Sequence, residues 1–337
     1  MDRRRFLATQ SLTALALLTG TSGLRLAHAA GIPVSIAESE GHSWAVPFVA
    51  DAGSLWAKNG LDASTTHFTS GRLTAEAVLA GKADFATTTD SVVALAALQG
   101  HKPVVFAEFA NSSTQMLVAA RKDKGVNVPA DLRGKRIGTF YGSAGHFYLN
   151  QYLKLHGLTP KDVQIINLRP QEMVTALAQG SIDAFNWDWW AADAAAKQEG
   201  KGNVHVLSTD GVEKVYTSHF LLITNEQTAK AKPAALQAAV RALIDAEAVF
   251  KNDFERAVSV LAERTKGSLD ASRNGLQRNH TEVQLAPRLI DDLVANAEWA
   301  IAEKIAQPPA NGDLRALYAG LIDKSALAAV APARVKL

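Results

Sequence analysis

Cysteine is absent from the 337 residues of the chain. Without cysteine there is no disulfide bond, no thiol nucleophile and no cysteine-ligated metal site. A lipid anchor attached to a cysteine behind an export signal is excluded as well. No long basic stretch interleaved with aromatic residues is present either, so we expect no nucleic acid partner.

Several motifs of enzymes are also missing. The nine histidines show neither an H-x-x-x-H nor an H-E-x-x-H spacing, the pattern of a zinc-binding helix. No G-x-S-x-G nucleophile elbow and no G-x-x-x-x-G-K-[ST] phosphate loop occurs. We therefore expect a protein that is not an enzyme, with no catalytic residues, no metal and no cofactor.

The N-terminal segment has the composition of an export signal. Residues 1–30, "MDRRRFLATQSLTALALLTGTSGLRLAHAA", combine a basic start, a short apolar stretch and the A-x-A cleavage pattern at 27–29. The stretch Arg3-Arg4-Arg5-Phe6-Leu7 resembles the twin-arginine signal R-R-x-F-L, although Asp2 and Ala8 depart from the usual pattern. We expect a signal peptide of the twin-arginine type and a mature protein that is soluble in the periplasm and not lipid-anchored.

This segment also explains the net charge of +2. Residues 1–30 contain four basic residues and one acidic residue, so 35 − 4 = 31 basic and 33 − 1 = 32 acidic residues remain. The rest of the chain has a net charge of −1, so its overall charge does not attract a polyanion such as a nucleic acid.

Changing both Arg3 and Arg4 to lysine should keep the precursor in the cytoplasm, because the arginine pair is the feature that this export route recognises. The measurement is the amount of protein in the periplasmic fraction. A normal periplasmic level of the double variant would exclude the twin-arginine route and leave export itself in place.

The remaining sequence alternates between short apolar strands and amphipathic helices, which predicts an α/β fold. The whole chain, with 47% hydrophobic and 20% charged residues, has the composition of an ordinary globular protein and is long enough for two lobes. From about Lys232 onward the pattern is mostly helical, with predicted helices over 233–250, 253–265 and 283–306. An earlier helix is predicted over 43–58.

A weak internal repeat divides the first two thirds of the chain. Residues 77–90, "AVLAGKADFATTTD", match residues 176–189, "ALAQGSIDAFNWDW", with a glycine and an aspartate at equivalent places. Each half therefore reads as a small α/β unit. Open α/β sheets bind ligands at the carboxyl ends of their strands, so we expect the site there.

The segment 131–200 resembles the second lobe of periplasmic substrate-binding proteins of the nitrate/sulfonate/taurine ABC transporter family. Its shared features are D-L-x-G-K before a strand, G-S-x-x-H at the start of a helix, G-L-x-x-x-D-V, and G-x-x-D-A followed by tryptophans. Residues 48–86 resemble the first lobe. The resemblance implies a two-lobed type II periplasmic binding protein: a clamshell with two crossover strands near 113–121 and 216–225 and a helical C-terminal region.

On this resemblance, one lobe comprises residues 31–115 and 222–337, and the other comprises residues 116–221. The family captures a small solute between the lobes and delivers it to the permease of an ABC importer in the inner membrane. The resemblance thus implies a monomer that binds a small organic anion or zwitterion, of the sulfonate or taurine kind. An aromatic or nitrogen-heterocyclic ligand, such as a thiamine-related pyrimidine, is the alternative. An enzyme of the same fold, the thiamine-pyrimidine synthase, needs a cysteine-rich iron motif that this chain lacks.

The turn "GSAGH" is the first candidate for ligand binding, and the resemblance implies that it holds an anionic head group. It comprises Gly142, Ser143, Ala144, Gly145 and His146. A helix start offers free N–H groups and the positive end of its dipole, and serine adds a hydroxyl. The alternative is that Ser143 only caps the helix and that His146 is a surface residue.

Two further segments end or follow predicted strands of the first lobe. Thr88, Thr89 and Asp90 can offer hydrogen bonds to a ligand, or they can cap the next helix. Ser43 and Trp44 follow the first strand, where the tryptophan can line the pocket or pack in the core.

The third candidate segment, "NWDWW", contains Trp187, Asp188 and Trp189. If the strand continues through it, the two tryptophans share one face and the aspartate lies on the other. Together with Glu38, Glu40, Asp90 and Glu108, Asp188 makes the strand ends more acidic than an anion site requires. Either these acids lie outside the pocket, or the ligand carries an amine or a heterocyclic nitrogen.

Overall fold

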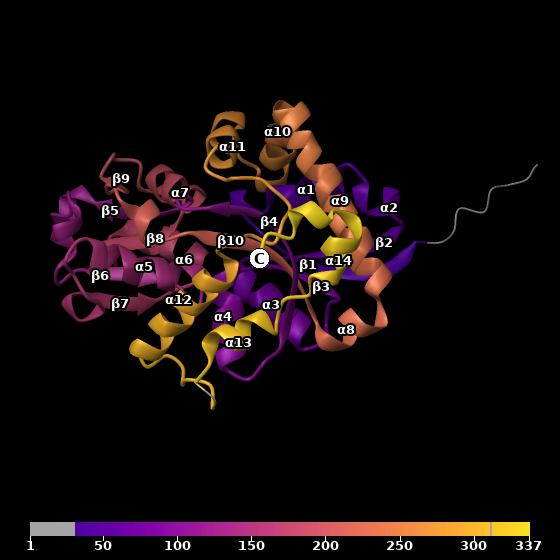
Figure 1. The fold of residues 1–337 in the computed structure, drawn as a ribbon. Coiled ribbons are helices and arrows are strands. Elements are labelled where there is room, and N and C mark those ends of the chain that lie inside the picture. Colours follow the sequence, from indigo (N-terminus) through magenta and orange to yellow (C-terminus); the bar gives the residue numbers. More distant parts are fainter. Residues whose placement is uncertain (1–30, 311) are drawn as a thin grey trace, which may run out of the picture. The chain divides into compact units, whose positions relative to one another are not determined.

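The computed structural model describes residues 31–310 and 312–337, so the predicted signal peptide lies outside the described residues. Two mixed five-stranded sheets organise them (Figure 1). In the first sheet the order is β2-β1-β3-β10-β4, with β1 parallel to β2 and β3, and β10 antiparallel to β3 and β4. Its strands are β1 (Ile32–Ser39), β2 (Leu61–Phe68), β3 (Phe85–Thr89), β4 (Pro103–Ser112) and β10 (Ser218–Asn225).

The second sheet repeats this plan with the order β7-β6-β8-β5-β9. Strand β6 is parallel to β7 and β8, and β5 is antiparallel to β8 and β9. Its strands are β5 (Met116–Arg121), β6 (Arg136–Thr139), β7 (Gln164–Asn167), β8 (Ala184–Asp188) and β9 (Val204–Val206). The α/β prediction is confirmed, and the internal repeat corresponds to one sheet in each half.

The repeated aspartates hold equivalent strands together. Each directly precedes a strand, and each accepts a hydrogen bond from the backbone of the neighbouring parallel strand. The N–H of Ser35 donates to Asp84 at 2.8 Å, and the N–H of Arg136 donates to Asp183 at 2.9 Å. The preceding glycines, Gly81 and Gly180, have φ angles of 68° and 73°, which favour glycine at a helix end.

Helices cover the faces of both sheets (Figure 1). Those before β10 are α1 (Ala45–Ala52), α2 (Leu55–Lys58), α3 (Gly71–Leu79), α4 (Asp90–Leu98), α5 (Ala144–Leu155), α6 (Pro170–Gln179) and α7 (Trp189–Glu199). Those after it are α8 (Glu226–Ala231), α9 (Pro233–Asn252), α10 (Phe254–Thr265), α11 (Leu269–Leu276), α12 (Leu289–Ala302), α13 (Leu314–Ala319) and α14 (Ser325–Val330). None of the helices in the described ranges is long and apolar enough to span a membrane.

Two predicted helices differ from the observed ones for local reasons. The helix expected over 43–58 is interrupted at Gly53 and Ser54, and Ser54 has a left-handed φ of 53°. The helix expected over 283–306 begins only at Leu289, because the preceding segment is extended. There Gln284 exchanges backbone hydrogen bonds with Glu108 of β4. Pairing with a strand thus overrides the helical pattern.

The C-terminal helices pack mainly on the first sheet, but α12 reaches the second lobe. Its Trp299 belongs to the apolar cluster that contains Phe147 of α5 and Tyr216. The rings of Trp299 and Phe147 lie 5.2 Å apart, centre to centre. The chain crosses between the sheets at residues 113–115 and again between β9 and β10.

Candidate functional site

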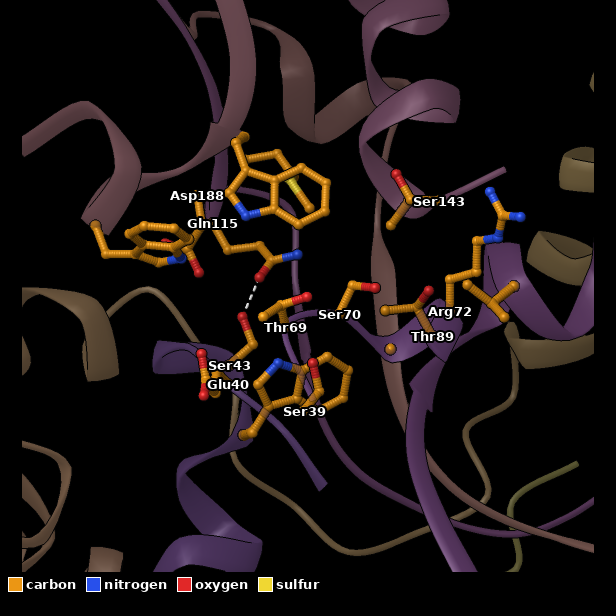
Figure 2. Close-up of a pocket in the computed structure, with 17 residues that line it drawn as sticks. Ser39, Glu40, Ser43, Thr69, Ser70, Arg72, Thr89, Gln115, Ser143 and Asp188 are labelled. Carbon is orange, nitrogen blue, oxygen red and sulfur yellow. Dashed lines mark hydrogen bonds between the residues drawn. The ribbon is translucent and has the colours of Figure 1, made fainter. Parts of the chain in front are cut away.

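A small cavity lies where strands of both sheets end (Figure 2). Its volume is about 40 Å³, the space of a few water molecules at about 10–15 Å³ each. This size suits a small solute. The lining residues are Ser39, Glu40, Ser43, Trp44, Thr69, Ser70, Gly71, Arg72, Thr89, Val92, Gln115, Met116, Ser143, Ala144, Trp187, Asp188 and Trp190.

Three buried hydroxyl groups of the lining have no hydrogen-bond partner among the described residues. They are Ser39 Oγ, Ser70 Oγ and Thr89 Oγ1. A buried polar group without a partner costs about 1–3 kcal/mol, so such groups are rare in folded proteins. A ligand oxygen in the cavity would accept their hydrogen bonds and remove that cost.

The same wall contains the starts of three helices. Ser70, Thr89 and Ser143 are the N-cap residues of α3, α4 and α5, yet none of the three side chains caps its own helix. The hydroxyl of Ser143 instead donates to the carbonyl of Phe140 at 2.6 Å. Helix N-termini carry free N–H groups and a partial positive charge, so their convergence favours an anionic group.

Arg72 adds a full positive charge to this wall and links the two lobes. Its Nη1 donates to the backbone carbonyl of Tyr141 at 2.8 Å, while its Nε donates to Glu76 at 2.9 Å. The guanidinium also lies 5.2 Å from the ring centre of Phe140. Since Tyr141 follows β6, this contact joins α3 of the first lobe to the second.

A second link joins the first lobe to the crossover between the sheets. The hydroxyl of Ser43 donates to Oε1 of Gln115, as the dashed line in Figure 2 marks. Gln115 is 5% exposed and lies just before β5. Both residues line the cavity, so a ligand there would contact both lobes and the crossover.

Asp188 brings a buried carboxylate to the opposite end of the cavity. It is 7% exposed, and its Oδ1 lies 3.7 Å from Nδ1 of His42, which is 5% exposed. Burial alone would lower the pKa of His42, but the neighbouring Asp188 carboxylate outweighs it and raises that pKa above 6.5. The carboxylate beside it therefore favours the protonated form of His42.

The three tryptophans of the "NWDWW" segment separate at the end of β8. Trp187 and Trp190 line the cavity, whereas Trp189 does not. The strand ends at Asp188 and α7 begins at Trp189, so the strand alternation expected through Trp189 stops there. The guanidinium carbon of Arg278 lies 3.7 Å from the ring centre of Trp189, whose Nε1 donates to the carbonyl of Thr114 at 3.2 Å.

The cavity thus brings together seven of the residues singled out from the sequence, namely Ser43, Trp44, Thr89, Ser143, Ala144, Trp187 and Asp188. Of the others, Thr88 donates its hydroxyl hydrogen to the carbonyl of Gly71 at 2.7 Å. Asp90 is fully buried beside His219, in a separate polar cluster.

The remaining residues of the "GSAGH" turn lie around the cavity rather than on its lining. Gly142 has a φ of 69° and lies beside Arg72. A Cβ on Gly145 would lie 3.0 Å from the ring of Trp187, so this glycine permits close packing behind the tryptophan. His146 stacks on the ring of Tyr141 at 4.7 Å, and burial lowers the pKa of His146 to about 4.

Sequence reasoning missed several lining residues, among them Ser39, Thr69, Ser70, Gln115 and Trp190. Thr69 and Ser70 stand between a strand and a helix, as Thr89 does, so the same local signal could have identified them. Gln115 lies in the crossover and has no local signal. Groups of three acidic or histidine side chains suited to a metal ion do not occur in the part of the chain that the structure describes.

Comparisons with known proteins agree with this architecture. A binding protein of Brucella abortus (strain 2308), named as such without a stated ligand, is 30% identical over 271 residues, which are 79% of this chain and 80% of that protein. The taurine-binding periplasmic protein of Escherichia coli (strain K12) is 30% identical over 154 residues, which are 45% of this chain and 47% of that protein.

Solved structures share the fold. The alkanesulfonate-binding protein SsuA from Xanthomonas axonopodis pv. citri, bound to MOPS, has a TM-score of 0.76 at 19% identity, covering 88% of this chain and all of that one. The desulfurization enzyme DSZB also has this fold, with a TM-score of 0.64 at 14% identity, covering 89% of this chain and 99% of that one. At these identities the similarity establishes the two-lobed type II periplasmic binding protein fold, which is common to binding proteins and at least one enzyme.

The family assignment rests on the sequence match. Residues 42–257 match the protein family described as NMT1/THI5 like. This segment includes every strand of both sheets except β1, and it includes every cavity residue except Ser39 and Glu40. The chain therefore belongs to the NMT1/THI5-like family of two-lobed solute-binding proteins, and the two relatives named above are named as binding proteins.

Proposed function

We propose that the protein captures a small organic anion or zwitterion, of the sulfonate or taurine kind, in the cavity between its lobes and delivers it to the permease of an ABC importer. The three buried hydroxyls without partners, at Ser39, Ser70 and Thr89, carry this proposal. They lie beside the starts of α3, α4 and α5. Such a wall offers hydrogen-bond donors and positive potential, which an anionic head group needs.

In this proposal the site residues bind and do not catalyse. One lobe is 31–115 with 222–337 and the other is 116–221, and the crossovers at 113–115 and before β10 permit closure. Closure requires contacts that exist only in the closed state. Arg72 with the carbonyl of Tyr141 is the contact between the lobes that would serve this purpose, and Ser43 with Gln115 ties the first lobe to the crossover. Export as a signal-peptide precursor to the periplasm, without a lipid anchor, belongs to the same proposal, as does a monomeric state.

A second ligand class has its own support. Trp44, Trp187 and Trp190 all line the cavity, and indole rings are suited to stacking against a flat ring. An aromatic acid or a nitrogen heterocycle would use the same hydroxyl donors for its polar atoms.

A thermal-shift screen of the mature protein tests the proposal. Alkanesulfonates, taurine, nitrate, aromatic acids and thiamine-related pyrimidines are each added at increasing concentration. A ligand at 100 times its Kd should stabilise the folded state by about 2.7 kcal/mol, which raises the melting temperature by several degrees. Stabilisation by sulfonates but not by pyrimidines supports the first ligand class, and the reverse supports the second. No stabilisation by any class would contradict the proposed function.

A further inference from the structure

Of the five acidic residues noted in the sequence, three lie away from the cavity and two line it. Glu38 accepts a hydrogen bond from Arg264 at 2.7 Å, away from the cavity. Glu108 and Asp90 lie in the buried cluster around His219. Only Asp188 and Glu40 line the cavity, and of these two only Asp188 is buried. The cavity therefore contains one buried carboxylate.

Within the part of the chain that the structure describes, that carboxylate accepts no hydrogen bond. Asp188 is the N-cap residue of α7, but its side chain does not cap the helix. Among the described residues its one ion-pair partner is His42, and the distance of 3.7 Å exceeds that of a hydrogen bond. A buried carboxylate normally accepts several hydrogen bonds, so Asp188 has capacity left for a donor in the cavity.

The two ends of the cavity differ in polarity. In Figure 2, Asp188 and Glu40 lie on one side, and Ser143, Arg72 and Thr89 lie on the other. Trp190 lies at the acidic end, because a Cβ on Gly41 would lie 3.7 Å from its Nε1 and 3.6 Å from Asp188 Oδ2, and Trp187, next to Asp188 in β8, lines the cavity as well. A carboxylate together with indole faces is a favourable environment for a cationic nitrogen. An anion would be repelled from this end and attracted to the other.

His42 already lies 3.7 Å from the same carboxylate. It comes from the first lobe, directly after β1, and Gly275 of α11 packs against its ring. Asp188 of β8 and Asp193 of α7 favour its protonated form, and Arg278, after α11, opposes it. Glu40 stands two residues before it at the exposed rim of the cavity. A second cation at Asp188 would therefore be placed beside a protonated imidazole.

We propose that Asp188 determines the specificity of the cavity: its carboxylate accepts a cationic N–H group of the ligand, in competition with the His42 imidazole beside it. This inference rests on the proposed function and specifies its ligand class as a zwitterion. When the cationic group binds, His42 loses its proton to the solvent, and the neutral imidazole no longer repels the ligand. Binding of a zwitterion thus releases up to one proton per site.

The sign of the pH dependence follows from this competition. Below the pKa of His42 in the free protein, binding must first remove the proton, so the affinity for a zwitterion decreases as the pH decreases. The largest slope is tenfold in Kd per pH unit. An anion without an amine makes no use of Asp188 and gains from a protonated His42, so its affinity does not decrease in the same range.

The experiment compares two probes that differ only in the ammonium group, taurine and ethanesulfonate, by titration calorimetry between about pH 5 and pH 8. β-Alanine and propionate form a second such pair. The wild-type protein should bind the amine-bearing probe at least tenfold more tightly at pH 8, and this preference should shrink toward pH 5. Titrations in two buffers of different ionisation enthalpy should show proton release on binding of taurine.

Three variants separate the parts of the inference. Asp188→Asn should remove the preference for the amine, and His42→Gln should keep the preference but remove its pH dependence. Asp193→Asn removes an acid from the exposed side of α7, so it serves as the matched control and should retain the preference. Melting curves of each variant establish that it is folded.

Each outcome decides between the two proposals. Equal affinity for taurine and ethanesulfonate, or a preference that survives Asp188→Asn, would overturn the role of Asp188 and leave the proposed function standing. A pH dependence that persists in His42→Gln would overturn the competition. If neither member of either pair binds, the proposed function fails, and the inference fails with it.

Discussion

Replacing His219 with glutamine is expected to lower the free energy of unfolding by about 3–5 kcal/mol at neutral pH, because it removes the positive charge from a buried cluster of acids. His219 is 2% exposed. Its Nδ1 lies 3.1 Å from Glu108 Oε2, and its Nε2 lies 2.9 Å from Asp292 Oδ2. Its backbone N–H donates to Asp90 at 3.2 Å. Arg288 also reaches Asp292, at 3.1 Å, but His219 is the one cation that pairs with Glu108 among the described residues.

The pH dependence of this loss follows from the pKa of His219. Burial alone would lower it, but hydrogen bonds with Asp292 and Glu108 and the nearby Asp90 outweigh burial and raise the pKa of His219 to about 10. A raised histidine pKa stabilises the folded state fully below about 6.5, the unfolded value, and the stabilisation is lost as the pH rises through about 10. The difference between wild type and His219→Gln should therefore shrink between pH 7 and pH 10.

Urea denaturation at both pH values measures this difference. His101→Gln is the matched control, because the His101 side chain is exposed and has no acidic partner in the described structure. That control should change stability by less than about 0.5 kcal/mol. A loss below 1 kcal/mol in His219→Gln at pH 7 would show that the charge of His219 is not needed by these acids.

The same cluster also affects how the free energy of unfolding changes with pH under acidic conditions. Burial raises the pKa of Asp90 to about 6, against 3.8 for an exposed aspartate. Ionisation of Asp90 is thus unfavourable in the folded protein, and this residue makes the protein less stable as the pH rises from about 4 to 6. Asn296 moderates the cost, since its Nδ2 donates to Asp90 Oδ2 at 3.0 Å.

The fold could be predicted from the sequence because its signals are periodic and occur twice. Strand patterns, glycine helix ends and the aspartates at 84 and 183 recur at a fixed offset, and each acts within its own sheet. What the sequence misjudged was long-range. The segment before α12 reads as helix, yet it is extended because Gln284 pairs with Glu108, a residue 176 positions earlier in the chain.

The sequence predicted site residues only where they lie at or just after the end of a strand, because that position can be inferred from the local pattern. Ser43, Thr89, Ser143 and Trp187 follow or end strands, and all four line the cavity. Which hydroxyl remains free cannot be inferred from the sequence, because it depends on neighbours from other elements. The hydroxyl of Thr88 donates to the carbonyl of Gly71, at the start of the preceding helix α3. The hydroxyl of the adjacent Thr89 finds no acceptor among the described residues.

Gly145 illustrates the same limit. A glycine at a helix start can permit a ligand to approach the backbone. In the structure the space above it is occupied by Trp187, and a Cβ would lie 3.1 Å from Asn186 Nδ2 as well as 3.0 Å from the indole. A larger side chain here would therefore displace the tryptophan before it met a ligand.

Thr89→Val should weaken ligand binding by about 1.5–3 kcal/mol, roughly 10- to 150-fold in Kd, without loss of stability. The hydroxyl of Thr89 is buried, has no partner in the described structure and does not cap α4, so its removal breaks no internal hydrogen bond. Valine has nearly the same shape and removes a buried polar group. The unliganded protein should accordingly be as stable as wild type, or more stable by about 1 kcal/mol.

Ser143→Ala is expected to do the reverse, although the sequence alone favoured its hydroxyl as a donor to the ligand. That hydroxyl has one hydrogen, and it is already donated to the carbonyl of Phe140 at 2.6 Å. Its loss should cost about 1 kcal/mol of stability and change the affinity less than threefold, because the anionic group is bound by the backbone N–H groups of the following helix turn. Urea denaturation and calorimetry with the same ligand, on both variants, measure the two effects separately. If Ser143→Ala lost the affinity and Thr89→Val kept it, the donors would be the helix caps of the second lobe, and the hydroxyls without partners in the first lobe would not bind the ligand.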